Sequence, residues 1–450
     1  MNGLEKPRRY LAIFAISCGS ALMVMDGALP NVALPTIAQE LNIDSSLAIM
    51  IVSVYQLVLV MTLLPLSALG GRIGLRRLYQ LGLCLFIGSA LLCFFAPNFP
   101  LLLAARALQA LGAAAALSVA SALLRLIYPT SQLGRGLGIN IIIVASAGGI
   151  APILGGYIVS EVNWHWIFVA TAPLGLLSLV VGQRALPDVA GHGQTISPLG
   201  ALLCALTFGL IISGLLAMAR GYHLPTSLAV LLLGVLAAVV FVRRELTQAT
   251  PILPVDLLAN RVVALSIISA QLAFIGSMTF VLSLPFRLQE HFGFSPSEVG
   301  TAIAPFPLAM MVSAPLAGML SDRYHPAILG SIGMAIATAG MLLLALLPEG
   351  ATQPDIAWRM AVCGAGYGLF FSPNAKLIIS AAPMARAASA GGLIATNRLA
   401  GQALGTALVA ALLAAGHGSD SSPALLGAVL TFLAGICSIA RLSNRVGGIR

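Results

Sequence analysis

Long apolar stretches, separated by short polar segments, recur along the whole chain. About 20 consecutive apolar residues are enough to cross the hydrocarbon core of a bilayer as an α-helix. The pattern therefore predicts an all-α membrane protein with fourteen spanning helices. The expected spans are 10–36, 47–69, 78–96, 100–127, 136–159, 165–186, 199–219, 225–242, 262–286, 299–320, 327–347, 355–379, 390–415 and 423–442.

The composition supports this class and excludes several others. Only 8% of the 450 residues are charged, whereas roughly 25% are charged in a soluble domain. The only two lysines, Lys6 and Lys376, stand outside any Gly-Lys-Ser/Thr sequence, so the phosphate-binding loop of ATP-driven proteins is missing. Neither Cys-x-x-Cys nor His-Glu-x-x-His occurs. We therefore expect no enzymatic activity, no metal and no cofactor.

The positions of the basic residues predict the orientation, because short cytoplasmic loops retain Lys and Arg. With the N terminus inside, all 23 Lys and Arg fall on the cytoplasmic side except five. Arg220, Arg287 and Arg359 fall outside, and Arg106 and Arg398 lie within spans. We expect a multi-pass protein of the bacterial inner membrane with both termini in the cytoplasm. The net charge of +9 then reflects topology and requires no nucleic-acid partner.

Two polar stretches, 187–198 and 243–261, bracket a pair of spans and leave six on either side. The loop at 69–72 reads Leu-Gly-Gly-Arg, and the corresponding loop of the second set, 320–323, reads Leu-Ser-Asp-Arg. Parallel repeats of six helices with a substrate site between them are typical of one large transporter architecture. The predicted domains are a six-helix bundle (1–190), a two-helix hairpin (191–250) and a second six-helix bundle (251–450).

Several motifs, in the correct order, resemble those of the fourteen-helix drug:proton antiporters of the major facilitator superfamily. They read Met-Asp-Gly-Ala-Leu-Pro-Asn-Val-Ala-Leu-Pro at 25–35, Arg-Ala-Leu-Gln-Ala-Leu-Gly at 106–112, Gly-Ile-Ala-Pro-Ile-Leu-Gly-Gly at 149–156 and Trp-His-Trp-Ile-Phe at 164–168. The resemblance covers nearly the whole chain. It implies two six-helix bundles with an inserted hairpin, a small-molecule substrate, protons as the coupling ion, the lipid bilayer as surroundings and a monomeric state.

The resemblance also implies gating and hinge residues, with one departure from the family pattern. In the loop after the second span, Gly71 replaces the usual Asp and Leu75 replaces an Arg, whereas the second half keeps Gly318 and its Asp-Arg pair. The inner gate of the first half is therefore expected to be weaker or held differently. The implied gating and hinge residues are Arg72, Gly149, Pro152, Gly155, Gly156, Asp322 and Arg323.

Asp26 is the strongest functional candidate, because it alone among the 14 acidic residues lies well inside an apolar helix. Ionisable groups within the membrane are costly and are functional candidates by default. The proton affinity of a carboxyl group depends on burial and on nearby cations, so a site opened alternately to two sides can load and release a proton. A permanent ion pair that joins two helices is the alternative.

Arg106 is the expected partner of Asp26. Both lie roughly 9–15 Å below the outer ends of their helices at 1.5 Å rise per residue. The resemblance implies that Arg106 couples protonation to helix movement, and the alternative is an arginine bonded to backbone carbonyls. A further intramembrane cation, Arg398, either extends to the interface or binds an anion.

Polar and aromatic residues at mid-depth are expected to line a substrate cavity, with interhelical hydrogen bonds as the alternative. They are Tyr55, Gln56, Gln109, Asn140, Gln271, Tyr367, Phe371 and Asn374. The resulting hypothesis is a proton-coupled antiporter that exports lipophilic, cationic small molecules by alternating access. An exporter of an endogenous organic anion or siderophore is the alternative, and a receptor or scaffold that transports nothing is a third reading.

Overall fold

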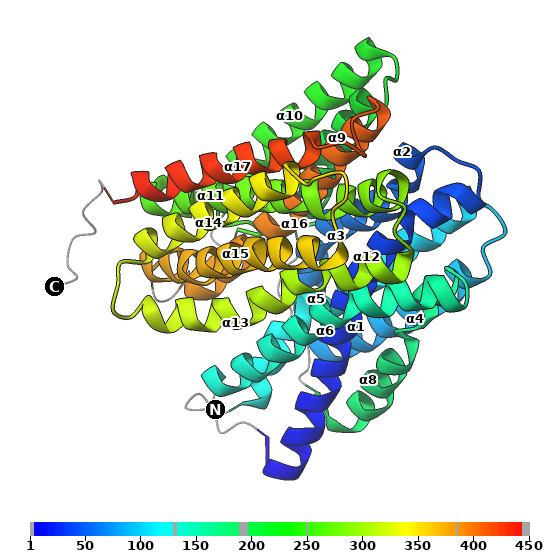
Figure 1. Cartoon of the computed structure of the whole chain (residues 1–450). Helices are drawn as coiled ribbons and strands as arrows, with labels where there is room; N and C mark the ends of the chain where they lie inside the picture. The colour runs from blue at the N-terminus through cyan, green and yellow to red at the C-terminus, as the bar shows by residue number, and fades with distance from the viewer. Residues whose placement is uncertain (1–3, 129–132, 189–196, 249–250, 384–385, 443–450) are drawn as a thin grey trace. The chain divides into compact units, whose positions relative to one another are not determined.

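A computed structural model describes residues 4–128, 133–188, 197–248, 251–383 and 386–442, and every regular element in them is helical (Figure 1). The first half contains α1 (Lys6–Glu40), α2 (Ser45–Ala48), α3 (Met50–Ile73), α4 (Leu75–Phe94), α5 (Phe99–Ile127), α6 (Leu133–Glu161), α7 (Trp166–Val169) and α8 (Ala172–Ala185). The remainder contains α9 (Pro198–Ala219), α10 (Leu224–Glu245), η2 (Val255–Ala259), α11 (Arg261–Phe286), η3 (Arg287–His291), α12 (Pro296–Ile303), α13 (Pro305–Leu320), α14 (Pro326–Ala345), α15 (Gln353–Ala381), α16 (Ala387–Ala414) and α17 (Ser422–Ala440).

A helix or a pair of short helices stands at each of the fourteen predicted positions. Within the described residues, twelve of these are long and apolar enough to cross a membrane. The other two, α15 with 29 residues and α16 with 28, are also long enough, since 20 residues suffice. The prediction of an all-α, multi-pass membrane protein is confirmed.

Proline explains where two of the spans are interrupted. The sixth span is divided into α7 and α8, and Pro173 lies in the first turn of α8. The tenth is divided into α12 and α13, and Pro305 begins α13. Proline is tolerated in a first turn because its missing N–H would have no helical partner there.

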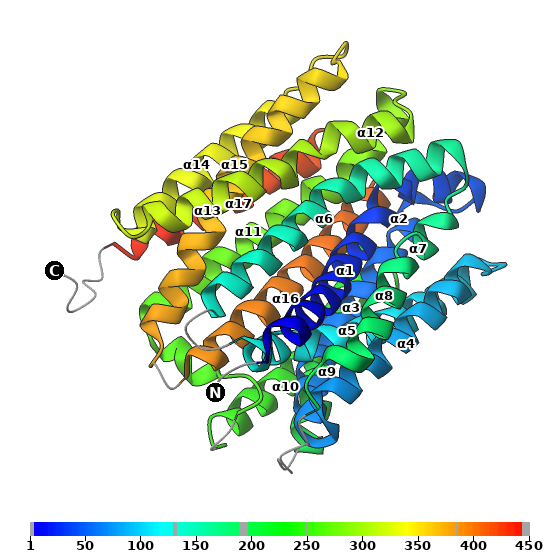
Figure 2. The same ribbon diagram turned by 90° about the horizontal axis from the view of Figure 1, so that it is seen from below.

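The chain forms two compact units. Unit 1 consists of Met1–Gly214, Leu228–Phe241 and Ser295–Gly300, and unit 2 consists of Leu215–Ser227, Val242–Phe294 and Thr301–Arg450. In unit 1, α1 packs against α5, α6 and α8, while α5 packs against α3 and α4 (Figure 2). In unit 2, α15 packs against α13 and α14, while α11 packs against α16 and α17.

The predicted two-helix hairpin corresponds to α9 and α10, and the structure supports only the packing of these two helices against each other. α9 and α10 do pack closely, because a Cβ added at Gly214 would lie 2.9 Å from the Leu231 nitrogen, and one at Gly234 would lie 2.8 Å from the Ile211 nitrogen. However, residues of this pair are divided between the two compact units. The hairpin as a separate part of the fold stays a prediction.

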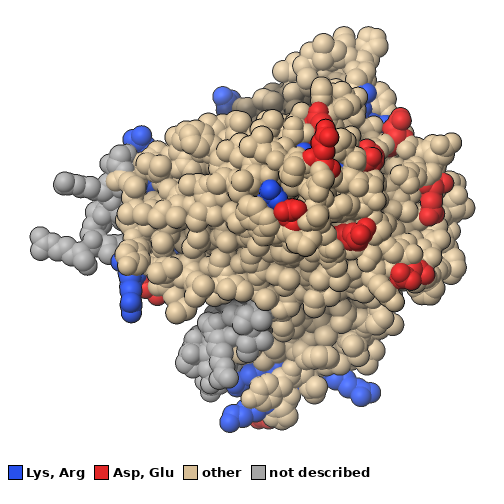
Figure 3. Space-filling view, viewed as in Figure 1, with Lys and Arg blue, Asp and Glu red and all other residues tan. Residues whose placement is uncertain are grey.

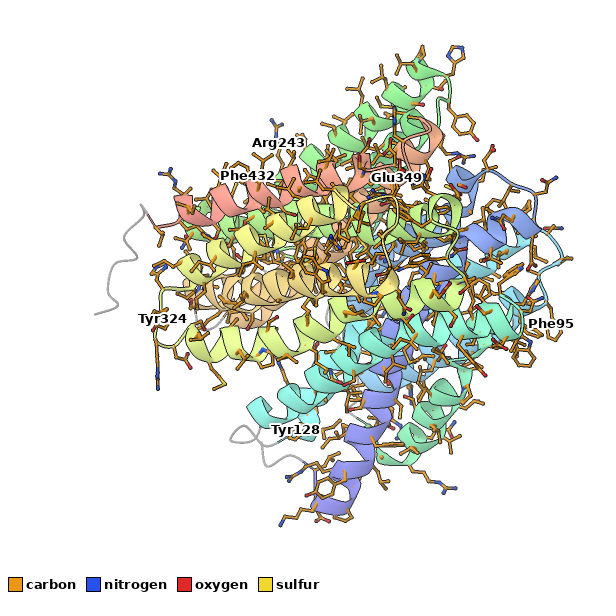
Figure 4. All side chains as sticks on the ribbon, viewed as in Figure 1. Phe95, Tyr128, Arg243, Tyr324, Glu349 and Phe432 are labelled. Atoms are coloured by element: carbon orange, nitrogen blue, oxygen red, sulfur yellow. The ribbon has the colours of Figure 1, made fainter. Side chains whose placement is uncertain are left out.

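The outside of the molecule is apolar, as a lipid-facing surface requires. Leu232 on α10 and Phe432 on α17 expose 67% and 58% of their surfaces. Figure 3 shows wide areas without charged side chains, and Figure 4 labels Phe432 on α17. In the same view Tyr324 and Glu349 flank the two ends of α14, a helix of 20 residues.

A surface ion pair joins the segment before α11 to the segment before α16. Arg386 donates hydrogen bonds to both carboxylate oxygens of Asp256. These hydrogen bonds hold the pKa of the Asp256 carboxyl below its usual range. The folded chain therefore binds fewer protons here than the unfolded chain, and the resulting stabilisation is present above the unfolded-state pKa and is lost as pH falls through the folded-state value.

We expect Asp256→Asn to lower the free energy of unfolding by less than about 1 kcal/mol at neutral pH, since an exposed pair contributes little. The difference from wild type should shrink at about pH 3, because the stabilisation declines below the unfolded-state pKa and is lost as pH falls through the folded-state value. Unfolding of the purified protein in detergent at the two pH values measures this. An equal loss at both would show that the carboxylate charge is not the cause.

Candidate functional site

Asp26 lies deep within α1, far from either end of the helix. The helix has 35 residues, and Asp26 is roughly 20 Å from the C-terminal residue Glu40 at 1.5 Å rise per residue. Its side chain is only 1% exposed. A carboxylate at this depth requires partners that replace water.

Two side chains of α5 supply these partners. The Arg106 Nη1 donates to both Asp26 oxygens, at 3.1 Å to Oδ2 and 3.3 Å to Oδ1. The Gln109 Nε2 donates to Asp26 Oδ1 at 3.0 Å. The same Arg106 Nη1 also donates to Gln109 Oε1 at 2.6 Å. Because residues three apart lie on one face of a helix, α5 presents both side chains to α1 together.

The guanidinium of Arg106 also contacts two further elements of unit 1. Its Nε donates to the Ile51 carbonyl oxygen of α3 at 3.4 Å. The ring of Tyr55 on α3 lies 4.3 Å from the Arg106 Cζ, and the ring of Phe168 on α7 lies 5.4 Å from it. Aromatic faces at such distances attract a cation. The Tyr55 hydroxyl interacts with Asp26 as well.

The negative charge of Asp26 balances the positive charge of Arg106. Binding of one proton by Asp26 would remove this balance. Arg106 is 1% exposed like Asp26, so neither charge is screened by bulk water. Removing one partner of a buried pair leaves an uncompensated charge and costs about 3–5 kcal/mol. Protonation of Asp26 would have the same electrostatic effect as removing it. The cluster therefore has two possible electrostatic states, one with Asp26 charged and one with Asp26 neutral.

The expected hinge helix, α6, packs closely against α1 just beyond Asp26. A Cβ added at Gly155 would lie 3.0 Å from the carbonyl oxygen of Leu29. Gly149 and Pro152 are buried, and Pro152 removes one hydrogen bond from within the helix. A Cβ at Gly156 would collide with the backbone of Pro296. These small residues allow close backbone contact, and their hinge role stays a prediction.

The remaining expected lining residues of unit 1 have unpaired polar atoms. Gln56 on α3 and Asn140 on α6 each have a buried side-chain oxygen without a hydrogen bond in the described residues. A buried acceptor of this kind is costly unless a donor reaches it. The expected role of these two residues in lining a substrate cavity stays a prediction.

The expected lining residues of unit 2 mostly bond to neighbouring helices. The Tyr367 hydroxyl is 2.8 Å from Thr431 Oγ1 on α17, and Tyr367 is fully buried. With its amide oriented to satisfy both ends, Gln271 on α11 donates to the Asn397 carbonyl oxygen on α16 at 3.0 Å. Phe371 stacks on Phe274 of α11 with ring centroids 4.3 Å apart.

Asn374, the last of these residues, leads to an arginine whose burial the sequence did not indicate. Its Oδ1 accepts from Arg441, and its Nδ2 donates to the Ser266 carbonyl oxygen at 3.2 Å. Arg441 at the end of α17 is only 1% exposed and also donates to Ser266 Oγ at 2.9 Å. Its recorded partners in the described residues are neutral, so it joins α11, α15 and α17 without an ion pair. The sequence pattern places Arg441 on the cytoplasmic side with most of the other basic residues, and only helix packing reveals its contacts.

Among the expected gate residues, Asp322 pairs within unit 2. Lys376 of α15 forms an ion pair with Asp322 and donates to the Ser321 carbonyl oxygen at 2.9 Å. Arg72 and Arg323 are exposed. Lys376 was not among the expected gate residues, although its position as a lone lysine near the inner end of a span could have indicated a local partner.

Comparison with known proteins assigns the family. The family model described as "Major Facilitator Superfamily" matches residues 16–406. The chain belongs to the major facilitator superfamily. It is 41% identical over 438 residues to the uncharacterized transporter YebQ of Escherichia coli (strain K12), which covers 97% of this chain and 96% of the relative.

Other relatives are transporters or resistance proteins. The riboflavin transporter RibZ of Clostridioides difficile (strain 630) is 28% identical, with coverage of 90% of this chain and 89% of the relative. The methyl viologen resistance protein SmvA of Salmonella typhimurium is also 28% identical, with 90% and 83% coverage. Mycobacterial multidrug resistance and efflux proteins match at 27%. The resemblance to the drug:proton antiporter branch of this superfamily is confirmed.

Solved structures agree on the fold. A transporter of the POT family, crystallised with a thioalcohol-conjugated peptide, superposes with a TM-score of 0.72 and covers 97% of this chain and 96% of that one. The two share 18% sequence identity, so this likeness concerns the fold alone. Its membership of the major facilitator superfamily and its apolar helices make the chain a multi-pass membrane transporter of small molecules.

Proposed function

We propose that this transporter exports lipophilic small molecules in exchange for protons, by alternating access across the bacterial inner membrane with both termini in the cytoplasm. The observation that supports this proposal is the buried cluster of Asp26, Arg106 and Gln109. Asp26 is the only carboxylate in the middle of a described membrane helix, and its ion pair with Arg106 is shielded from bulk solvent.

The cluster provides a mechanism for coupling. When the site opens to the proton-rich side, Asp26 takes up a proton and its attraction to Arg106 is lost. Arg106 then keeps only its neutral contacts with Gln109, the Ile51 carbonyl and the Tyr55 ring. Because α1 and α5 lose the contact that holds them in this arrangement, a different arrangement becomes accessible. Release of the proton to the other side restores the pair and resets the transporter.

The cargo has two candidates. The sequence favours lipophilic cations, and a relative is a methyl viologen resistance protein. A cation would reach a free carboxylate only in a state in which Asp26 has left Arg106, because the two are paired here. Organic anions are the second candidate, and the exposed Arg398 on α16 favours them. A receptor or scaffold would keep Asp26 paired and would be indifferent to the proton gradient.

Efflux from pump-deficient bacterial cells tests the proposal. Cells that express wild type should expel a fluorescent lipophilic cation or a fluorescent organic anion, and a protonophore should stop that efflux. Asp26→Asn should abolish efflux at equal expression, because the residue can no longer take up a proton. Asp188→Asn is the matched control, since Asp188 is 60% exposed in a surface pair. Undiminished efflux by Asp26→Asn would refute this proton site, and protonophore-insensitive efflux would refute proton coupling.

A further inference from the structure

Arg398 lies near the middle of a membrane helix. It is roughly 16 Å from the first residue of α16, Ala387, and roughly 24 Å from the last, Ala414, at 1.5 Å rise per residue. The hydrocarbon core of a bilayer is about 30 Å thick. At about three helical turns from the nearer end, the guanidinium needs water or a polar partner, and extension to the interface stays the alternative prediction.

Arg398 also differs from the other deep arginines in having no partner. Arg106 and Arg441 are each 1% exposed and make several hydrogen bonds. In the described residues, Arg398 has no hydrogen bond, ion pair or ring contact, and its side chain is exposed. A cation within the membrane needs water, a polar partner or an anion, and the described residues around Arg398 supply no hydrogen-bond or ion-pair partner.

The packing of α16 shows which side of the helix is free. Asn397 donates to the Ile267 carbonyl oxygen of α11 at 3.2 Å, and a Cβ at Gly401 would lie 2.6 Å from Phe274 Cβ on α11. These residues therefore face α11. Arg398 is rotated about 100° from Asn397. Gly391, two turns before Arg398 on the same face, has nothing within 4 Å of an added Cβ, whereas a Cβ at Gly405, two turns after it, would lie 2.9 Å from the Ile275 carbonyl oxygen of α11. The free part of this face is therefore the part that precedes Arg398.

A second polar side chain shares this face. Gln402 follows Arg398 by one turn and is partly exposed. Its side chain has no recorded hydrogen bond in the part of the chain that the structure describes. An arginine offers five donors in a planar fork that matches carboxylate, sulfonate and phosphate oxygens. An amide one turn away adds one more donor to such an anion.

An aromatic pair lies next to this part of α16 within unit 2. Phe274, the neighbour of Gly401, stacks on Phe371 of α15. Both rings are partly exposed, so an aromatic or otherwise flat apolar body can pack against them. Arg398 lies one turn before Gly401, whose neighbour is this aromatic pair. A cation and an apolar surface in this arrangement suit an amphiphilic anion.

We propose that Arg398 and Gln402 form a binding site for the anionic group of the transported molecule, with an apolar body held beside Phe274 and Phe371. That the bound anion is the transported molecule rests on the proposed export function, whereas anion binding itself does not. The depth of Arg398 favours cargo over a lipid headgroup, because headgroups stay at the interface. The expected substrates are lipophilic carboxylates, sulfonates or phosphate esters.

Binding to the purified full-length protein in detergent tests the site with four probes that share one apolar body. They are 2-naphthoate, 2-naphthalenesulfonate, 2-naphthyl phosphate and the neutral 2-naphthol. We expect wild type to bind at least one anion about tenfold more tightly than 2-naphthol, as a charge-assisted hydrogen bond predicts. Arg398→Gln should remove this preference, and Arg398→Lys should keep part of it. Arg261→Gln is the matched control, because Arg261 in unit 2 is also exposed and has no recorded partner.

Each outcome decides the proposal. Equal binding of all four probes, no binding of any anion, or an anion preference that persists in Arg398→Gln would overturn the site. A preference that phosphatidylglycerol abolishes in competition would assign the site to lipid instead of cargo. The experiment is independent of proton coupling, since binding is measured without a gradient. If the anion preference holds but protonophores do not affect efflux, only the proposed coupling fails.

Discussion

Asp26→Asn should lower the free energy of unfolding by about 3 kcal/mol or more, because Arg106 would stay buried without its counter-charge. Arg106 is 1% exposed and bonds both oxygens of the Asp26 carboxylate, so bulk water cannot replace the lost partner. Unfolding of the purified protein in mixed detergent micelles measures the effect. The same variant should be inactive in efflux.

The double variant Asp26→Asn/Arg106→Gln separates the stabilising role of the pair from its role in coupling. With both charges removed, no uncompensated charge is left, and most of the lost stability should return. Efflux should remain absent, because no group can take up the proton. A double variant as unstable as Asp26→Asn would show that shape and not charge explains the loss. Protonophore-sensitive efflux by the double variant would place the coupling site elsewhere.

Gly112→Ala should destabilise unit 1 by about 1–3 kcal/mol, which is typical of overpacking. A Cβ at Gly112 would lie 2.6 Å from the Phe86 nitrogen and 2.7 Å from the Gly82 carbonyl oxygen. Backbone atoms cannot rotate away as a side chain can, so α4 and α5 must move apart. Because α5 carries Arg106 and Gln109, transport should fall as well.

Gly88→Ala is the matched control for this substitution. Gly88 lies on α4, like Phe86, and has nothing within 4 Å of an added Cβ. Alanine there should be neutral or stabilising by up to about 1 kcal/mol, because glycine is unfavourable in a helix interior. Unfolding of both variants in detergent gives the comparison. Equal effects of the two substitutions would show that the contact between α4 and α5 does not limit stability.

The helices were largely predictable from the sequence because the bilayer imposes a simple rule. A chain segment in hydrocarbon must satisfy its own backbone hydrogen bonds, so an apolar run of sufficient length becomes a helix. All fourteen predicted spans coincide with helical segments, including α15, whose Asp355, Arg359 and Lys376 interrupt its apolar pattern. The breaks at α7–α8 and α12–α13 were not predicted, because a proline in a span does not reveal whether the helix bends or restarts.

For the candidate site, the sequence predicted only how deep its residues lie along their helices. Counting residues along two helices placed Asp26 and Arg106 at similar levels, and the structure brings them into contact. Their pairing depends on how α1 and α5 are rotated about their axes, which follows from contacts spread over the whole bundle. Gln109 was expected to contact substrate, yet here it bonds both charges.

By itself, the sequence determined the class of protein, the positions of fourteen apolar helical segments and the one carboxylate deep in an apolar helix. These follow from local composition, because hydrophobic length and charge are properties of short segments. Only the tertiary structure decided that Arg106 is engaged by Asp26, that Arg441 is buried among neutral partners and that Arg398 is left without one. These three arginines thus differ in their contacts, because a contact depends on which helices meet and on which faces they present.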